Sequence, residues 1–478
     1  MPVSRRDFVR ASAAIPFATW FNQYGFAQTA AVRFEVTTPQ GQAMVKKYAT
    51  AVAKMMATPK TSPLSWTFQW YTHFIPTPKP ATLTTVFGAS PSPQRSLANE
   101  MWNTCQSHMG QPEDYFLPWH RMYVLFFESI IRAVLADDSF TLPYWNYSVS
   151  GAAHGVLPVA FHSASDPILK SLFLANRNSG VNSGVPIDKG QPGILGLDSL
   201  AQTTYSPSGP KPGFCSDLDS KLHGAVHVSV GNSSNMGSIP SAAGDPIFWM
   251  HHCNIDRLWA SWNKGGNPNP KGSTFLSKTF VFADHTGKRV VAKIGDFLDI
   301  VPLHYTYDRF EPVPARPPVA HAIPGPPKPA ATVASATAVS LAPRAVRVPL
   351  SKPIRGAAIP RQGAGGPVSY YVVIEGLNVD RQPGVLYNLY LNLPEAASDA
   401  TSASHLIGSL NFFGSMSHEM GVGTHATINR FVSFDITPLV QRLGTQAVSG
   451  DLHVTVAPAG TPQNEAQPKL ASLKIVSA

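Results

Sequence analysis

The chain has 478 residues, of which 44% are hydrophobic and 14% charged, and its formal net charge is +9. This length exceeds one ordinary domain and provides enough apolar residues for a large buried core. The basic residues are scattered along the chain, which argues against a nucleic-acid or membrane-surface ligand. The absence of any run of eighteen or more apolar residues argues against a membrane span.

The N-terminus carries a paired-arginine pattern. Residues 4–10 read SRRDFVR, a short apolar run follows over 11–20, and small residues occupy 25–27. This arrangement resembles a twin-arginine export signal. We therefore expect residues 1–27 to be a signal peptide recognised by the Tat export machinery, and the mature protein to be periplasmic or secreted.

Three histidines in the first quarter of the chain have surroundings suited to a metal site. His73 lies in WYTHFIP, His108 in CQSHMG and His120 in FLPWHRMYVLFFE. Residues 121–136 carry apolar side chains on all sides with Glu128 among them, which predicts a buried helix that holds His120 rigidly. These three imidazoles could bind one ion together.

A second group of histidines follows a stretch rich in Gly, Ser and Pro at 176–212, which we expect to form long loops over the site. His223 and His227 lie four residues apart in KLHGAVHVS, a spacing that directs both imidazoles from one helical face toward one ion. A further helix is predicted at about 246–262, and His252 on that helix would complete a second set of three nitrogens.

The ligand pattern narrows the choice of metal. Imidazole binds copper, zinc, iron and nickel, so ligand type alone is not decisive. Most two-metal hydrolases bridge their ions with a carboxylate, and neither group of histidines has one nearby. A dicopper centre that binds oxygen fits better, and a zinc hydrolase is the less favoured alternative.

Asp256 lies one turn after His252 on the predicted helix. It could accept a hydrogen bond or pair with an arginine, and so steady the ligands. The alternative is a surface salt bridge with Arg257 or another base.

Together these motifs resemble the type-3 copper proteins of the tyrosinase and polyphenol oxidase family. The segments that carry the resemblance are His73, WNTCQSH at 102–108, FLPWHRMY at 116–123 with Glu128, the pair His223 and His227, and NMGSIPSAAGDPIFWMHHCNIDRLW at 235–259. The resemblance implies two copper ions, the first bound by His73, His108 and His120, and the second by His223, His227 and His252. His251 would line the pocket rather than bind copper.

Four positions near the implied site bear on its chemistry. In relatives, an Asn directly after the first ligand of the second copper, with a Glu nearby, can hold a basic water. Here that position is Gly224, and the possible water-holding carboxylate is Asp219. Ile239 replaces a Phe that plant enzymes often carry over the pocket, which implies a more open entrance. Cys105 could form a thioether with a histidine, as in relatives, or remain a free thiol.

The family resemblance also implies a domain organisation. Residues 28–311 would form a mainly α catalytic domain, a four-helix bundle around the dicopper centre. Tyr305 and Tyr307 resemble the tyrosine motif that closes this domain in plant polyphenol oxidases. The Pro- and Ala-rich stretch at 312–345 has few large apolar residues and is predicted to be a linker.

Residues 346–478 are predicted to form a β-sandwich, because alternating apolar and β-branched residues recur in short segments. Strands are expected at 370–374, 386–393, 407–412, 430–436, 452–456 and 473–476. The order of these segments resembles the C-terminal domain of plant polyphenol oxidases. This implies a domain that shields the copper pocket and keeps the enzyme latent, and a passive stabilising module is the alternative.

The implied activity is that of a copper- and oxygen-dependent polyphenol oxidase. We expect it to oxidise o-diphenols to o-quinones and also to hydroxylate monophenols. A catechol oxidase without monophenolase activity is the main alternative, and a hemocyanin-like oxygen-binding protein is a further one. The implied cofactors are two copper ions, with molecular oxygen as co-substrate. Phenolic small molecules and an activating protease are the implied partners, with no role for nucleic acid or a membrane span.

Overall fold

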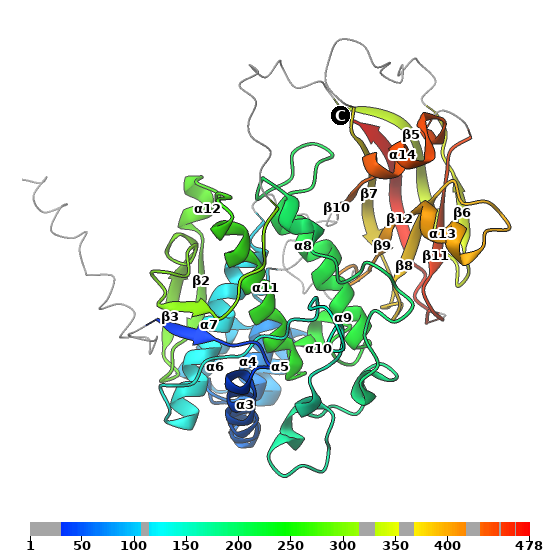
Figure 1. Cartoon of the computed structure of the whole chain (residues 1–478). Coiled ribbons are helices and arrows are strands. Elements are labelled where there is room, and N and C mark those ends of the chain that lie inside the picture. The colour runs from blue at the N-terminus through cyan, green and yellow to red at the C-terminus, as the bar shows by residue number, and fades with distance from the viewer. Residues whose placement is uncertain are drawn as a thin grey trace, which may run out of the picture.

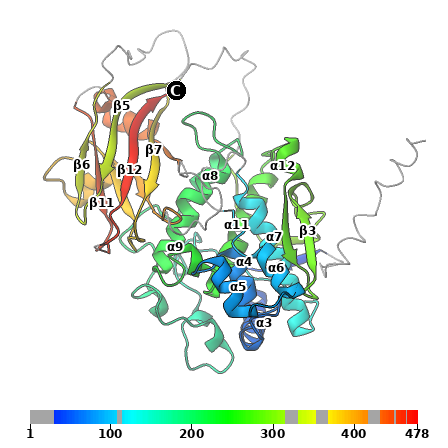
Figure 2. The same ribbon diagram turned by 180° about the vertical axis from the view of Figure 1, so that it is seen from behind.

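The computed structural model describes residues 30–106, 114–314, 330–352, 368–416, 431–448, 451–463 and 465–478. The predicted signal peptide, residues 315–329 of the Pro-rich stretch and His108 lie outside these ranges. The described chain forms a helical region followed by a β region (Figures 1 and 2). Among the described residues, no helix is long and apolar enough to cross a membrane.

The helical region contains most of the helices and four short strands. Its helices are α3 (Pro39–Ala57), α4 (Trp66–His73), α5 (Lys79–Phe87), α6 (Pro93–Met101), α7 (Phe116–Leu135), α8 (Phe214–Leu218), α9 (Gly224–Val230), α10 (Ile239–Ala242), α11 (Ile247–Lys264) and α12 (Ser273–Ser277). A π-helical turn over Asp219–His223 joins α8 to α9. Strand β1 (Ala31–Arg33) pairs in parallel with β4 (Tyr305–Tyr307), and β2 (Thr279–Ala283) pairs antiparallel with β3 (Arg289–Lys293).

Helices α7 and α11 form the centre of this region. Nearly every residue of both helices is buried. Helix α7 is mostly apolar on all sides, whereas α11 buries polar side chains that include His251, His252 and Asp256. The rings of Phe127 on α7 and Trp249 on α11 are stacked, with an interplanar angle of 11°. Both predicted helices are therefore confirmed, although α7 begins earlier than expected, at Phe116. The stretch at 176–212 forms loops with short 3-10 turns, as predicted.

A buried network of charged side chains ties the ends of the helical region to its centre. Asp256 on α11 accepts hydrogen bonds from Arg121 at 2.5 Å and Arg33 at 3.2 Å, and from the hydroxyl groups of Tyr305 and Tyr307 at 2.6 Å each. The predicted pairing of Asp256 with an arginine is confirmed, and the surface alternative is wrong. The tyrosine motif therefore closes the helical region by binding the helix that carries His252.

The β region is a sandwich of two four-stranded antiparallel sheets. Their strands are β5 (Ala331–Ser340), β6 (Val346–Pro349), β7 (Tyr370–Asn378), β8 (Tyr387–Leu391), β9 (Leu406–Leu410), β10 (Phe431–Asp435), β11 (His453–Pro458) and β12 (Lys469–Ser477). The strand orders are β10-β7-β12-β5 and β6-β11-β8-β9. Apolar side chains of both sheets share one core. The region also contains two helices, α13 (Asp399–His405) and α14 (Thr437–Leu443). All six predicted strands are confirmed, with shifted bounds.

The prediction of a linker over 312–345 is wrong for its second half. Residues 331–340 form β5, which pairs with β12 along its whole length. The sequence ATVASATAVS suits an edge strand because Val333, Ala334 and Val339 are buried while the small polar residues between them tolerate partial exposure. The strand is rich in alanine and its buried residues do not alternate, since Val333 and Ala334 are adjacent, so no period-two pattern indicated a strand here. The β region therefore begins at Ala331 rather than at residue 346.

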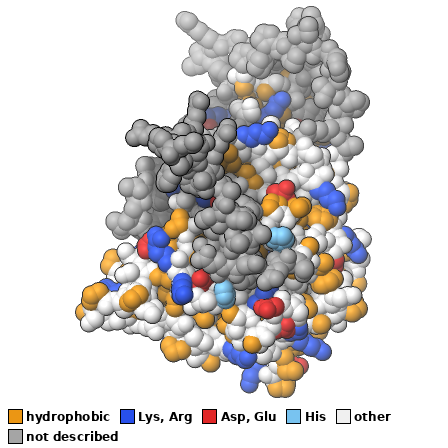
Figure 3. Space-filling view, turned by 90° about the vertical axis from the view of Figure 1, so that its left-hand side faces the viewer, with side chains coloured by type: hydrophobic (Ala, Val, Ile, Leu, Met, Phe, Trp, Pro, Cys, Tyr) orange, Lys and Arg blue, Asp and Glu red, His pale blue; other side chains and the backbone are white. Residues whose placement is uncertain are grey.

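The two regions are in direct contact. Figures 1 and 2 place α8 and α9 on the side of the helical region that faces the β region. Ser433 on β10 donates a hydrogen bond to the Pro210 carbonyl at 2.6 Å, and the Lys221 ammonium lies 4.8 Å from the centre of the Phe434 ring. Elsewhere, on the face drawn in Figure 3, basic and acidic side chains of the described residues are interspersed.

Candidate metal centre

The structure brings five of the six predicted ligands together in the core of the helical region. His73 ends α4, His120 lies in the second turn of α7, His227 belongs to α9, His252 belongs to α11 and His223 ends the π-helical turn. Each of these side chains is at most 2% exposed. Four separate helical segments therefore converge on one buried site, as the predicted four-helix bundle requires. The sixth predicted ligand, His108, lies outside the described residues.

The possible ligand atoms form two groups. One group contains His223, His227 and His252 together with His251, with ligand atoms within 4.8 Å of one another, and the other contains His73, His120 and Cys105. The two groups adjoin, because the rings of His120 and His252 are stacked with centroids 4.2 Å apart. The geometry thus provides adjacent places for two ions.

Backbone carbonyl groups fix the orientation of three rings. Nδ1 of His73 lies 3.2 Å from the Ile239 carbonyl, Nδ1 of His120 lies 2.8 Å from the Phe116 carbonyl, and Nδ1 of His227 lies 2.7 Å from the Met236 carbonyl. A hydrogen on Nδ1 leaves the Nε2 lone pair available to a metal, the usual tautomer for a ligand held in this way. The segment NMGSI at 235–239 therefore orients one ligand in each group, through the carbonyl groups of Met236 and Ile239. The sequence did not indicate this role, because it depends on backbone atoms rather than side chains.

The protonation state also suits metal binding. Burial and the neighbouring His223 lower the pKa of His227 well below its usual value, and burial with neighbouring imidazoles, His120 first, does the same for His252. Neutral imidazole is the form that coordinates metals. Nε2 of His223 is buried and has no hydrogen-bond partner among the described residues. A buried nitrogen of this kind is expected where a metal binds, so the residues fit the copper pair that the family implies.

When bound, a pair of copper ions would supply two-electron redox chemistry with molecular oxygen. His73 and His120 would hold one ion, and His223, His227 and His252 the other. The protein itself contributes fixed ligand orientation and exclusion of water, since the ligands are enclosed by aromatic side chains. Phe248, for example, lies with its ring centroid 4.9 Å from that of His73 and 4.2 Å from that of His252.

Asp219 contacts a predicted ligand directly. Its Oδ1 lies 2.9 Å from Nδ1 of His223, one helical turn later. The carboxylate therefore accepts a hydrogen bond behind the ring and directs Nε2 of His223 into the centre. A water-holding role for Asp219 stays a prediction. Ile239 is fully buried, and the more open entrance expected from it also stays a prediction.

Cys105 and His251 are placed close to the centre but their roles remain as predicted alternatives. Cys105 Sγ lies 3.7 Å from Nε2 of His120, which places the His120 ring within reach of a thioether bond. His251 is fully buried, its ring is stacked on that of His223 with centroids 5.4 Å apart, and neither of its nitrogens has a hydrogen-bond partner among the described residues.

The structure adds a residue that the sequence did not indicate. Phe413, from the loop after β9, is 2% exposed and packs in the core of the helical region. Its ring is stacked on His227, with centroids 4.1 Å apart and an interplanar angle of 13°. It also lies edge-on to His223, with centroids 5.6 Å apart. The β region therefore places an aromatic side chain directly on the second group of histidines.

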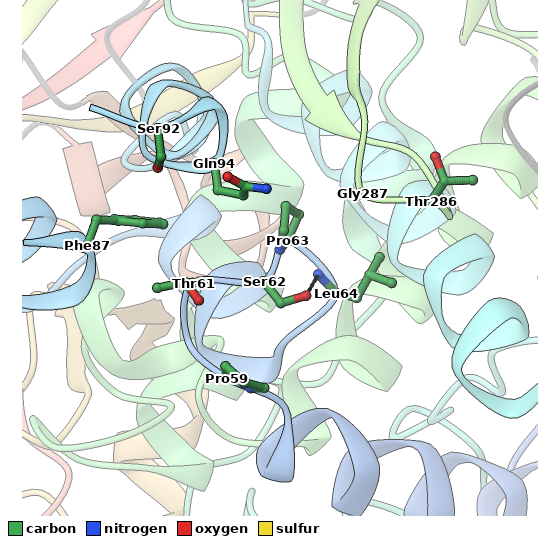
Figure 4. A pocket seen from close by; sticks show the side chains of 10 residues that line it. All are labelled: Pro59, Thr61, Ser62, Pro63, Leu64, Phe87, Ser92, Gln94, Thr286 and Gly287. Atoms are coloured by element: carbon green, nitrogen blue, oxygen red, sulfur yellow. Dashed lines mark hydrogen bonds between the residues drawn. The ribbon is translucent and has the colours of Figure 1, made fainter. Parts of the chain in front are cut away.

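A separate cleft of about 600 Å³ lies between the loop before α4 and the β2–β3 hairpin (Figure 4). Its lining residues are Pro59, Thr61, Ser62, Pro63, Leu64, Phe87, Ser92, Gln94, Thr286 and Gly287. None of these is titratable or a predicted ligand. This cleft therefore takes no part in the chemistry of the metal centre.

Comparisons with known protein families match both regions of the chain. The family model described as the common central domain of tyrosinase matches residues 63–184 and 196–265, which include every predicted ligand. A second family model, a domain of unknown function, matches residues 329–475. This second match begins at residue 329, two residues before the start of β5 at Ala331, and so agrees with the observed start of the β region.

Individual proteins show the same likeness. The tyrosinase HcTyr1 of Hahella sp. is 31% identical over 65% of this chain and 71% of its own length. Aureusidin synthase of Antirrhinum majus is 30% identical over 41% of this chain, but only 40% of that relative is covered. The structure of latent apple tyrosinase superposes with a TM-score of 0.61 at 22% identity, covering 94% of this chain and 98% of that chain. This last likeness extends the shared fold to both regions.

Proposed function

Because this chain belongs to the tyrosinase and polyphenol oxidase family of type-3 copper oxidoreductases, we propose that it oxidises o-diphenols to o-quinones and also hydroxylates monophenols. We further propose that it is latent while the β region covers the copper centre, and that it is exported by the twin-arginine pathway. Two copper ions and molecular oxygen would be required for both reactions.

The observation that carries this proposal is the stacking of Phe413 on His227. A planar six-membered ring lies parallel to an imidazole of the proposed second copper site, so this place accepts an aromatic ring. Phe413 has no hydroxyl group and is therefore inert in this position. The same contact supports both the aromatic substrate class and the latency, because Phe413 and a phenol would compete for one space.

Hydroxylation of monophenols requires the phenol to lose its proton near the second copper. Asp219 is a buried carboxylate in contact with His223, and it could accept that proton or hold a water that does. Gly224 provides no amide side chain to assist. A catechol oxidase that lacks the hydroxylation step is therefore the alternative, and it needs no base at this place.

Oxygen uptake by the copper-loaded protein tests the proposal. We would supply a catechol and, in separate reactions, a monophenol, before and after limited proteolysis between residues 314 and 330. The proteolysed protein should be assayed at nanomolar dilution so that the two regions can separate. Turnover of the catechol that rises after cleavage is the expected result, and uptake with the monophenol would establish hydroxylation.

Two controls make the assay decisive. His252→Ala should show no uptake before or after cleavage, because it lacks a ligand for the second copper. His154→Ala should behave like the wild type, since His154 binds Asp188 away from the centre. Reversible oxygen binding without turnover of any phenol, in both the intact and the cleaved protein, would instead identify an oxygen carrier.

A further inference from the structure

The β region makes a second contact beside the metal centre, at Gly224. This glycine directly follows His223 at the start of α9. A Cβ atom built on Gly224 would lie 2.3 Å from Oδ1 of Asn411 and 2.7 Å from both its Cγ and its Nδ2. These separations are far below van der Waals contact. Any side chain at position 224 would therefore collide with Asn411, which belongs to the β region.

The backbone gives no reason for a glycine at this position. Gly224 has φ −64° and ψ −33°, ordinary values for a right-handed helix. Alanine favours such a conformation more than glycine does, because glycine loses more backbone freedom on folding. The helical region on its own would thus be at least as stable with alanine at 224. The space taken by Asn411 is the feature that requires a glycine here.

Asn411 is held firmly in that space. It is 1% exposed, and its Nδ2 donates a hydrogen bond of 2.6 Å to the carbonyl of Ser220. Its Oδ1 accepts a hydrogen bond of 3.2 Å from the backbone N–H of Phe413. Ser220 lies within the π-helical turn, where the regular i to i−4 pairing of carbonyl groups is interrupted. The carboxamide therefore links the turn that carries His223 to the residue stacked on His227.

We propose that Gly224 is the docking position for Asn411, and that this fit allows the β region to close over the copper centre with Phe413 in place. This inference rests on the proposed latency and adds the residue pair that controls it. Substituting Gly224 with alanine expels Asn411, breaks both hydrogen bonds of the carboxamide and moves Phe413 away from His227. The β region then no longer covers the copper centre, although the chain is not cleaved.

The test measures backbone hydrogen–deuterium exchange in the full-length chain. Amide exchange reports whether the β region is docked on the helical region, and it does so whether or not the protein oxidises phenols. In Gly224→Ala, amide exchange over residues 411–416 should be faster than in the wild type by about tenfold or more, with the core of α7 unchanged. Gly272→Ala is the matched control, since a Cβ there has no atom within 4 Å and its φ of −63° suits alanine. It should exchange like the wild type. Unchanged protection over 411–416 in Gly224→Ala would overturn the proposal.

A double-mutant cycle separates the collision from a general effect on the interface. Asn411→Ala removes all three atoms that approach the added Cβ, so Gly224→Ala should have little further effect in that background. A full effect of Gly224→Ala in the Asn411→Ala background would also overturn the proposal. Ser433→Ala removes a hydrogen bond at the same interface without a collision, and should raise exchange much less.

Catechol oxidation provides a second readout that depends on the proposed function. Gly224→Ala should oxidise a catechol faster than the intact wild type without any proteolysis. If the exchange rises but neither protein oxidises catechols, the docking contact stands and the proposed oxidase activity fails. If both proteins are active at the same rate with the same exchange, the docking contact fails and the oxidase activity stands.

Discussion

Four of the five described ligands are oriented by an oxygen atom behind the ring, whereas Nδ1 of His252 is buried without a hydrogen-bond partner among the described residues. A carbonyl oxygen is close to Nδ1 of His73, His120 and His227, and the Asp219 carboxylate is close to Nδ1 of His223. These contacts fix the rings before any metal binds, so metal binding requires little ordering of side chains. A ligand substitution should consequently remove metal without unfolding the helical region.

His252→Ala tests this directly. Copper bound per chain, measured by elemental analysis after dialysis, should fall by about half or more, because the second ion would retain only His223 and His227. The far-ultraviolet circular dichroism spectrum should be unchanged. His154→Ala serves as the control and should keep the copper content of the wild type. Full copper occupancy in His252→Ala would contradict the assignment of the second site.

Phe413→Ala tests the aromatic contact that closes the centre. Truncating a buried phenylalanine costs about 3 kcal/mol at the low end of the usual range. A cost of that size would raise the population of a rare open state on the order of 100-fold. The intact Phe413→Ala chain should therefore oxidise a catechol at a much higher rate than the intact wild type. Phe412→Ala, which truncates the neighbouring ring in the core of the β region, should unfold that region more easily and gives a measure of nonspecific opening.

The elements of the helical region are joined through buried charges. Glu128 on α7 binds Arg33 on β1 at 2.9 Å and Arg132 at 2.5 Å, while Asp256 on α11 binds Arg33 and Arg121. One strand and two helices thus share a network from which water is excluded. Removing one charge from such a network leaves its partners buried without compensation.

Asp256→Asn should destabilise the protein by about 3–5 kcal/mol, because Arg33 and Arg121 would remain buried with half of their opposing charge lost. Chemical denaturation followed by tryptophan fluorescence measures this loss. Glu100→Gln removes a partner of Arg289 in an exposed ion pair, and should cost less than about 1 kcal/mol. Equal losses in the two variants would show that the network contributes no more than a surface pair.

The same network predicts how stability depends on pH. Burial alone would raise the pKa of Asp256, but Arg121 and Arg33 outweigh it and lower that pKa below its usual value; Arg33 and Arg132 have the same effect on Glu128. In the unfolded chain both carboxyl groups bind protons near about pH 4. The two carboxylates therefore contribute fully to the free energy of unfolding above that pH. This contribution is lost as the pH falls through their lower pKa values in the folded protein. Below about pH 4, denaturation midpoints should fall more steeply for the wild type than for Asp256→Asn.

The sequence predicted elements best where one local pattern dominates. Helices α7 and α11 are long, and each carries a predicted ligand within a recognisable motif, so both were predicted, α11 within two residues of its observed bounds and α7 with a start five residues late. Strand β5 was missed because it is rich in alanine and has no period-two pattern of buried residues. Asn411 and Phe413 could not be found at all. The hydrogen bond from Asn411 to Ser220 spans 191 positions in the sequence, and no local pattern reports a contact between two folded regions.

Under the proposed latency, closure of the β region over the centre is an intramolecular equilibrium. The loop after β9 inserts Asn411 and Phe413, and the contacts of Ser433 and Lys221 flank them. While the chain is continuous, the β region is present at an effective concentration on the order of millimolar. Closure then requires only modest affinity from the interface, where Leu386 and Phe413 of the β region are buried in the core of the helical region.

Cleavage between residues 314 and 330 should turn this equilibrium into one that depends on protein concentration. After cleavage, the catechol turnover per molecule should rise as the protein is diluted from about 10 μM to about 10 nM, because the separated β region rebinds less often. The intact chain should show one low turnover at every dilution, since opening and closing within one chain do not depend on protein concentration. Stopped-flow and steady-state oxygen uptake cover this range of concentrations. A cleaved protein whose turnover is high and constant from the first dilution would show that the interface has no affinity of its own and that the covalent connection alone maintains latency.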